Sequence, residues 1–263
     1  MLEVQNLSVT ARNGTQLLKQ ISFQIEIGEA VGLTGQSGAG KTTLLKALLG
    51  ILSGGCQVSG GTIQVDGQSL WALSPRKRRE LCGTTLGFIP QNPMTALDPS
   101  MRIGRQMDET LRLHSDKSRQ QRYNYILRLL HDVGLDDPDR VYRAYPHMLS
   151  GGMLQRVIIA MAMMLDAKFV LADEPTTALD VIHRNGIIDL FSQMKANGVG
   201  IFMVTHDFAT ALQLGGNVLV MKEGKIIESG EVQSVFDHTT EPYTRSLIEA
   251  YSLSCAFTKG AES

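Results

Sequence analysis

One glycine-rich segment constrains the fold of this chain more than any other part of its sequence. The segment reads Gly35-Gln36-Ser37-Gly38-Ala39-Gly40-Lys41-Thr42. An apolar run at 30–33 precedes it, and a stretch of good helix formers at 44–49 follows it. The glycines allow backbone N–H groups to wrap a phosphate, and the N-terminus of the helix adds positive potential. The pattern predicts a strand, a phosphate-binding loop and a helix, with Lys41 on the β- and γ-phosphates and Thr42 on Mg²⁺.

Composition and charge are those of an ordinary globular protein. The chain has 263 residues, of which 43% are hydrophobic and 19% charged, enough for one large core or for one core plus a small subdomain. A net charge of −1 gives no support for nucleic-acid binding. Three cysteines, Cys56, Cys82 and Cys255, lack metal-ligand spacing and suggest a reducing compartment. The longest apolar run, 157–165, is shorter than the roughly 20 residues of a membrane span, and no leader is evident, so we expect no crossing of a bilayer.

The hydrophobic pattern changes character along the chain. Alternating apolar residues predict an edge strand at 2–10, a strand at 21–27 and a hairpin at 62–67, and a short apolar run predicts a strand at 86–90. Residues 102–165 are predicted to be mostly helical, with one helix from Ser118 to Val133 capped by Gly134. Strand patterns return at 169–172, 200–204, 218–221 and 225–228. This order predicts an α/β domain with a helical subdomain inserted or packed on one side.

Two carboxylates follow the apolar run at 169–172. Asp173 and Glu174 stand where a buried strand ends, and open α/β sheets bind ligands at the carboxyl ends of their strands. We expect Asp173 to hold Mg²⁺, directly or through water. Glu174 is expected to position and polarise an attacking water, the role that separates hydrolysis from binding alone.

A second anion site is predicted at 149–156. Ser150 is a good helix N-cap, and Gly151 and Gly152 leave backbone amides open at the start of that helix. Two phosphate-binding helix N-termini in one chain suggest that two chains face each other head to tail, each completing the nucleotide site of the other.

Together, the segments 35–42, 149–156 and 173–180 resemble the nucleotide-binding subunit of an ATP-binding-cassette (ABC) transporter, and the resemblance runs from residue 2 to about residue 250. It implies a P-loop NTPase fold of the α/β class, with an ABC-type ATPase core, an antiparallel β subdomain and a helical subdomain. A single ATPase domain over 1–263 is expected, with its core at about 1–91 and 166–240, the helical subdomain at about 92–165 and a tail at 241–263.

The resemblance also assigns residues to roles. Gln91 matches the glutamine that senses Mg²⁺ and the membrane partner, Asp180 the loop that crosses the dimer interface, and His206 the switch histidine on the γ-phosphate. The implied catalytic residues are Glu174, His206 and Gln91, and the implied Mg²⁺ ligands are Thr42, Gln91 and Asp173. The implied ATP-binding residues are Arg12, Gly35, Gln36, Ser37, Gly38, Ala39, Gly40, Lys41, Thr42, Thr43, Ser150, Gly151, Gly152 and Asp180.

Two positions depart from the family pattern. Arg12 stands where the family usually has an aromatic residue that stacks on adenine, and we expect weaker adenine packing and looser base selectivity. Met153 replaces the usual glutamine at the fifth signature position. Because the backbone amides of that segment bind the phosphate, activity is expected to survive the second change.

Three segments, 91–99, 150–156 and 241–247, resemble the peptide/nickel importer branch, although Glu241 replaces the usual histidine. The Met153-Leu154 pair, and a tail holding only Cys255, favour the nickel and metal–metallophore members. Di- or oligopeptide import remains an alternative. A function outside transport, as an accessory subunit of the carbon–phosphorus lyase complex, also remains open. The DNA-repair type of ABC ATPase needs a long coiled-coil insertion, which does not fit in 263 residues, and the translation type carries two cassettes, whereas this chain has one.

The partners that the resemblance implies are a second ABC ATPase subunit, identical or homologous, in a head-to-tail dimer, and two membrane-spanning permease subunits. An extracytoplasmic substrate-binding protein would act indirectly, and the expected location is the cytoplasmic face of the bacterial plasma membrane.

Eight of the twelve methionines fall between residues 94 and 164. One hypothesis is a groove that holds a helix of a membrane subunit, with Met94, Met101 and Met107 as the better contact candidates. The alternative is a methionine-rich core of the helical subdomain, in which we expect Met161, Met163 and Met164 to lie.

Overall fold

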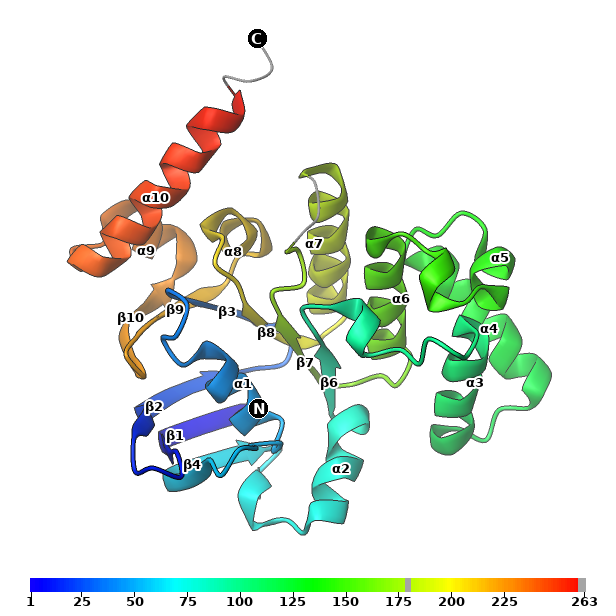
Figure 1. Cartoon of the computed structure of the whole chain (residues 1–263), viewed down its shortest axis with the longest axis horizontal. Helices are drawn as coiled ribbons and strands as arrows, with labels where there is room; N and C mark the ends of the chain where they lie inside the picture. The colour runs from blue at the N-terminus through cyan, green and yellow to red at the C-terminus, as the bar shows by residue number, and fades with distance from the viewer. Residues whose placement is uncertain (178–180, 260–263) are drawn as a thin grey trace. The chain divides into compact units, whose positions relative to one another are not determined.

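The computed structural model describes residues 1–177 and 181–259, and the chain divides into two compact units (Figure 1). Unit 1 comprises Met1–Ser74 and Ile201–Ser263, and unit 2 comprises Pro75–Gly200. Within the described residues, no helix has both the length and the apolar character that crossing a membrane requires.

Unit 1 contains an antiparallel sheet in the order β2-β1-β4-β5. Its strands are β1 (Leu2–Thr10), β2 (Gln16–Ile25), β4 (Gln57–Val65) and β5 (Gln68–Ser69). The hairpin prediction at 62–67 is confirmed, because Asp66 and Gly67 turn between β4 and β5 with positive φ angles of 49° and 76°. The prediction of an edge strand at 2–10 is wrong, since β1 pairs with β2 on one side and with β4 on the other. Alternation reports that one face is buried and says nothing of pairing.

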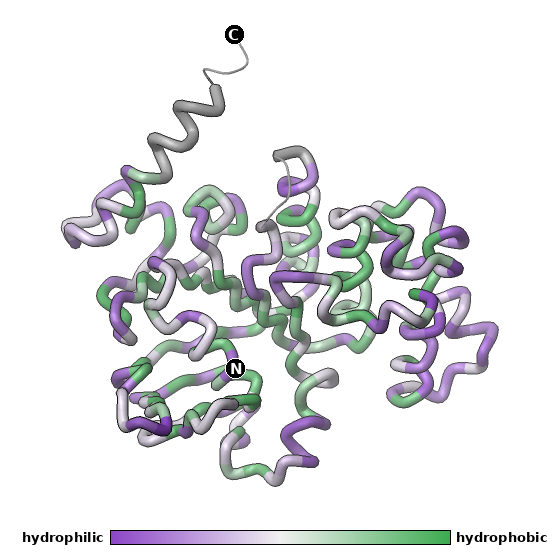
Figure 2. Tube along the Cα trace, in the orientation of Figure 1, coloured by the Kyte–Doolittle hydropathy of each residue, from purple (hydrophilic) through white to green (hydrophobic). Residues whose placement is uncertain are grey.

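A second set of strands in unit 1 is built around β3 (Ala30–Thr34), all five of whose residues are buried. β8 (Gly200–Val204) and β9 (Asn217–Lys222) pair with β3 in parallel, and β10 (Lys225–Glu231) pairs with β9 in antiparallel fashion. Figure 2 shows β3, β8 and β9 mainly in the hydrophobic colour. The rings of Phe23 and Phe202 stack at 5.3 Å and pack β2 against β8. The helices of unit 1 are α1 (Lys41–Leu48), η1 (Leu70–Ala72), α8 (Phe208–Leu214), α9 (Val232–His238) and α10 (Pro242–Lys259).

Unit 2 is mostly helical, as the sequence predicts for 102–165. Its only described strands, β6 (Leu86–Ile89) and β7 (Phe169–Asp173), pair in parallel. Its helices are α2 (Pro75–Thr84), η2 (Pro93–Thr95), α3 (Ile103–His114), α4 (Arg119–Asp132), α5 (Pro138–Arg143), η3 (Pro146–Met148), α6 (Gly151–Met163) and α7 (Val181–Ala196). The predicted helix from Ser118 is confirmed, since Ser118 and Gln121 form a reciprocal capping box and Gly134 follows the last turn with φ 79°.

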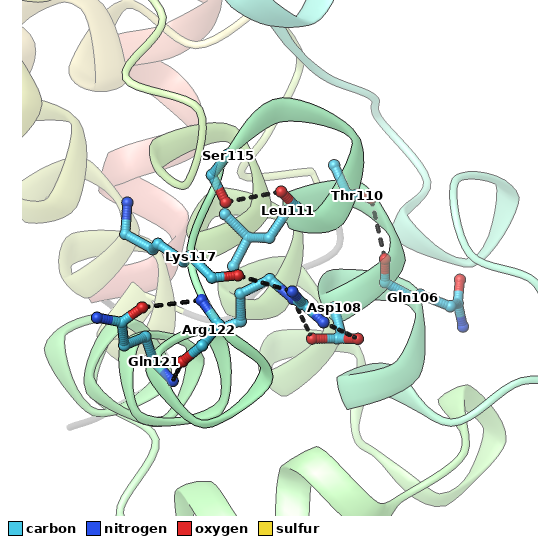
Figure 3. A network of polar contacts seen from close by, with 9 residues as sticks. Gln106, Asp108, Thr110, Leu111, Ser115, Lys117, Gln121 and Arg122 are labelled. Atoms are coloured by element: carbon cyan, nitrogen blue, oxygen red, sulfur yellow. Dashed lines mark hydrogen bonds and ion pairs between the residues drawn. The ribbon is translucent and has the colours of Figure 1, made fainter.

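A polar network ties α3 to α4 (Figure 3). The Arg122 guanidinium donates from Nε and Nη2 to the two carboxylate oxygens of Asp108, at 2.6 and 3.2 Å, and from Nη1 to the Lys117 carbonyl at 2.8 Å. The Arg122 side chain is 11% exposed, so the planar fork is largely withdrawn from water and geometrically fixed. These hydrogen bonds tie the first turn of α4 to α3 and to the turn between the two helices.

A close approach to Gly104 fixes α5 on α3. A β-carbon at Gly104 would lie 2.4 Å from the ring of Tyr142. That ring cannot easily yield, because Tyr123 packs edge-on against it at 5.0 Å and the Tyr123 hydroxyl donates to Asp139 at 2.6 Å. The position therefore demands glycine for lack of space and not for its backbone angles.

We predict that Gly104→Ala destabilises the protein even though alanine is the better helix former. The gain in helix propensity is at most about 1 kcal/mol, whereas overpacking costs about 1–3 kcal/mol. Urea unfolding of Gly104→Ala should show the loss, and the same change in a Tyr142→Ala background should be neutral or stabilising because the ring is gone. A Gly104→Ala variant that is more stable than the parent contradicts this account.

Candidate functional site

In unit 1, the glycine-rich loop joins β3 to α1. Gly35 begins it with φ 150°, and a β-carbon there would lie 2.2 Å from the Met221 carbonyl oxygen at the end of β9. Gly40 ends the loop as the N-cap of α1, with φ 110°. The loop therefore presses against the backbone of a neighbouring strand at its start and turns sharply into a helix at its end. The predicted order of strand, loop and helix is confirmed.

Lys41 is the first residue of α1, and its side chain lies inside the loop. The residue is only 8% exposed, and its Nζ donates to the carbonyl oxygens of Gly35 at 2.6 Å and Gln36 at 3.0 Å. A concentrated positive charge thus sits below a loop whose outer residues Gln36, Ser37 and Gly38 are exposed. Thr42, next along α1, is also exposed, and Thr43 is half-buried.

A residue that the sequence analysis did not assign to the loop touches it. The Gln36 N–H donates to the hydroxyl oxygen of Tyr243, at the start of α10, over 2.9 Å. The Lys222 ammonium lies 4.9 Å from the centre of the Tyr243 ring. Gln36 and Tyr243 are 207 positions apart in the sequence, which explains why no local pattern predicts this contact.

Arg12 and His206 are the other predicted site residues of unit 1. Arg12 is exposed in the turn after β1, and a β-carbon at Gly55 would lie 2.8 Å from its Cβ and 3.2 Å from its Cδ. The aliphatic stem of Arg12 therefore rests on the loop before β4. His206 is exposed directly after β8, and Asp207 caps α8 by accepting the Ala209 N–H at 2.9 Å.

In unit 2, the structure brings two predicted residues together. The Gln91 side chain donates from Nε2 to Oε2 of Glu174 at 3.2 Å. β6 and β7 are parallel and in register, with Ile89 opposite Ala172, so the segments that follow them leave from the same edge. Glu174 has a positive φ of 45°, an unusual angle for a residue with a side chain. Such strain often marks a functional position.

The Glu174 carboxylate has a further neighbour that the sequence analysis missed. The Thr177 hydroxyl donates to the same Oε2 atom at 3.0 Å. Thr177 lies three residues after Glu174 in the chain. A hydroxyl at that short spacing from the carboxylate is the one sequence signal that could have indicated this contact. Gln91 and Thr177 therefore hold one carboxylate oxygen of Glu174 from two directions. Asp173, half-buried, ends β7 immediately before it.

The predicted second anion site is the start of α6. Ser150 is the N-cap, and its Oγ accepts the Met153 N–H at 3.3 Å. Ser150 and Gly151 are exposed, and nothing lies within 4 Å of a β-carbon built on Gly151. Met153 thus serves the cap through its backbone N–H. Asp180 lies outside the described residues.

The methionine predictions for unit 2 divide. Met94, in η2, is 41% exposed, as a contact surface requires, and Met101 is half-buried. Met107 is fully buried in α3, so its assignment to a contact groove is wrong. Helical spacing places it on the inner face of α3 with Ile103 and Leu111. Of the predicted core residues, Met164 is buried, and Met161 and Met163 are half-buried.

An apolar hollow in this unit is lined by Gly83, Gly87, Phe88, Ala96, Ile158, Met161, Ala162 and Leu165.

Comparison with known proteins identifies a family. The model of the family described as ABC transporter matches residues 18–177. The dipeptide transport ATP-binding protein DppD of Escherichia coli (strain K12) is 35% identical over 254 residues, covering 95% of this chain and 78% of DppD. The metal-staphylopine import system ATP-binding protein CntD of Staphylococcus aureus (strain Mu50) is 35% identical over 250 residues, covering 94% of this chain and 92% of CntD.

Two solved structures are similar along most of the chain. The structure of cbiO1 from Clostridium perfringens, part of the ABC transporter complex cbiONQ, has a TM-score of 0.79 at 28% identity and covers 90% of each chain. The dimeric, post-hydrolysis structure of the ATP-binding cassette MJ0796 bound to ADP and Pi has a TM-score of 0.78 at 25% identity. It covers 88% of this chain and 99% of that one.

Proposed function

Because the chain belongs to the ABC transporter family, whose ATP-binding domain is an ATPase, we propose that it drives import through membrane subunits and that its cargo is nickel or a metal–metallophore complex. The metal-staphylopine relative supports this cargo, and that relative is matched over nearly its whole length. The alternative cargo, a di- or oligopeptide, is supported by the dipeptide and oligopeptide relatives at the same level of identity. The observation that carries the ATPase mechanism is the Glu174 carboxylate held by Gln91 and Thr177.

We propose that the loop at 35–42 binds the phosphates of ATP. Its backbone amides and the buried Lys41 ammonium supply positive potential without rearrangement, because the charge is already fixed by two carbonyls. The side chains of Thr42 and Thr43 complete the loop end. His206, exposed after β8, is proposed to stabilise charge on the γ-phosphate.

Glu174 is the proposed general base and orients the attacking water. A carboxylate can polarise water only while it is ionised and held in place, and the hydrogen bonds that Gln91 and Thr177 donate to Oε2 help to hold the Glu174 carboxylate in place. Gln91 is therefore the proposed positioning partner of the base. Phosphoryl transfer needs mainly positioning and charge neutralisation, which these residues supply.

The residues proposed as magnesium ligands fit that ion. Thr42, Gln91 and Asp173 offer a hydroxyl, an amide and a carboxylate, and Mg²⁺ prefers such oxygen donors. Gln91 uses its amide nitrogen on Glu174, so its amide oxygen is the atom left for a cation. Bound magnesium would neutralise charge on the phosphates.

Dimerisation is proposed to complete the site. Ser150, Gly151 and Gly152 would bind the nucleotide held by a facing ATPase, a copy or a homologue, and Asp180 would cross that interface. The similarity to a dimeric cassette bound to ADP and Pi supports this arrangement. We propose one ATPase domain with its core at about 1–91 and 166–240 and a helical subdomain at about 92–165.

The membrane partners are proposed to be two permease subunits at the cytoplasmic face of the bacterial plasma membrane, with an extracytoplasmic substrate-binding protein acting indirectly. The apolar hollow beside Phe88, together with exposed Met94, is the proposed seat of a permease segment. Phe88 is 39% exposed, and an exposed aromatic ring next to an adaptable methionine suits contact with an irregular partner.

We predict that Glu174→Gln retains ATP binding and loses turnover by about 10²-fold or more, because an amide cannot accept a proton. ATPase rates and nucleotide affinity should be measured side by side, with Glu80→Gln as the control. Glu80 forms an exposed ion pair with Arg76 and takes no part in the site. Near-normal hydrolysis by the Glu174 variant would refute the assignment of the base.

Arg12 should limit both affinity for ATP and discrimination against other bases. A guanidinium plane stacks on a base with less area than a ring, so Arg12→Tyr should lower the KM for ATP by about fivefold and sharpen preference over GTP. Arg12→Ala should change both in the opposite direction. Kinetics with ATP and GTP test this, and an unchanged or higher KM for ATP in the tyrosine variant shows that Arg12 does not meet the base.

The cargo is tested by uptake of labelled nickel and of a labelled dipeptide in cells that carry this chain or its Glu174→Gln form. We expect nickel uptake alone to fall in the variant. Loss of dipeptide uptake alone would establish the peptide alternative. If neither changes, import of these cargoes is excluded, and co-purification with membranes then separates transport of another cargo from a soluble complex.

A further inference from the structure

A single peptide group at the start of the phosphate-binding loop is held from both ends. The peptide that joins Gly35 to Gln36 is trans, so its C=O and N–H point in opposite directions. Its C=O accepts from the buried Lys41 ammonium at 2.6 Å, and its N–H donates to the Tyr243 hydroxyl at 2.9 Å. Hydrogen bonds at the two ends of one amide polarise each other and strengthen together. Lys41 and Tyr243 are therefore coupled through one rigid plane.

The Tyr243 ring is itself firmly placed. The Lys222 ammonium lies over the face of the ring, 4.9 Å from its centre. Lys222 is the last residue of β9, and the carbonyl of the residue before it, Met221, presses against Gly35. Tyr243, with Leu247 and Ile248, packs against an apolar cluster of α8, α9, β9 and their neighbours. A hydroxyl fixed in this way costs little further entropy to hold at the loop.

The segment that leads into α10 is anchored separately. The Thr239 hydroxyl is 2.7 and 2.8 Å from the two carboxylate oxygens of Glu228 in β10, and the Glu241 N–H donates to Thr239 Oγ1 at 3.2 Å. Thr244, the residue after Tyr243, is fully buried. The start of α10 is thus tied to β10 and to the apolar cluster of the same unit that carries the loop.

We propose that Tyr243 is a positioning residue for the phosphate-binding loop, and that the start of α10 is part of the nucleotide site. The proposal rests on the proposed role of Lys41 in binding phosphate. Tyr243 acts through the Gly35–Gln36 peptide: it fixes the orientation of the carbonyl that holds the Lys41 ammonium. Any partner or modification that shifts the start of α10 therefore changes affinity for nucleotide without touching it.

The test is Tyr243→Phe, which removes the hydroxyl and keeps the ring, its packing and its contact with Lys222. Loss of one hydrogen bond should raise the KM for MgATP and the Kd for ADP by about 3–10-fold, with kcat within about twofold of the parent. Tyr125→Phe is the matched control, because Tyr125 also carries a lysine ammonium over its ring, from Lys117 at 5.3 Å, and lies in unit 2. It should leave all three constants unchanged.

Raised KM and Kd values with a nearly unchanged kcat indicate that Tyr243 positions the loop. A merely structural role would instead reduce the amount of folded, active protein and leave KM and Kd as they are. Lys41→Ala in parallel separates the two levels of the argument. If Lys41→Ala abolishes nucleotide binding while Tyr243→Phe leaves KM and Kd unchanged, the proposal for Tyr243 is wrong and the loop assignment stands. If Lys41→Ala binds ATP and ADP like the parent, both are overturned.

Discussion

The hydrogen bonds between the buried Lys41 ammonium and the carbonyls of its own loop are the interaction on which the nucleotide-binding unit depends. A lysine that is only 8% exposed is costly unless its charge is satisfied, and the carbonyls of Gly35 and Gln36 satisfy it. Those carbonyls reach the ammonium only because the loop starts in a conformation open to glycine, pressed against the Met221 backbone. Charge, loop and strand β9 are therefore interdependent, and in the proposed site a phosphate would meet positive potential that is already in place.

The features that the sequence predicts well are those set by short-range patterns. The strand, loop and helix around Lys41 follow from glycine spacing between an apolar run and helix formers. The meeting of Gln91 with Glu174 follows from one more rule, that parallel neighbouring strands end at the same edge. Neither residue needed a long-range contact to be placed, because each directly follows a buried strand. The roles of these residues in hydrolysis stay proposals.

What the sequence could not supply is pairing and packing between distant segments. Alternation in β1 reports a buried face, so it could not reveal that both edges of the strand are paired. Met107 was expected at a contact surface on composition alone, whereas its position on the inner face of α3 decides its burial. Tyr243 and Gln36 are 207 positions apart, and the contact joins the Tyr243 hydroxyl to the backbone N–H of Gln36. Because any residue except proline has a backbone N–H, the residue type at position 36 could not indicate this contact.

The two departures from the family pattern, Arg12 and Met153, differ in how strongly they are expected to affect activity, because one acts through its side chain and the other through its backbone. At Met153 the backbone N–H makes the contact, to the Ser150 hydroxyl, so a change of side chain leaves the helix start intact. At Arg12 the side chain itself is what would meet a base, and its stem already rests on Gly55. A substitution there replaces the surface that is proposed to meet the base. A changed side chain at a position that acts through its backbone is therefore weak evidence about activity, whereas the proposed contact of Arg12 with the base depends on the side chain itself.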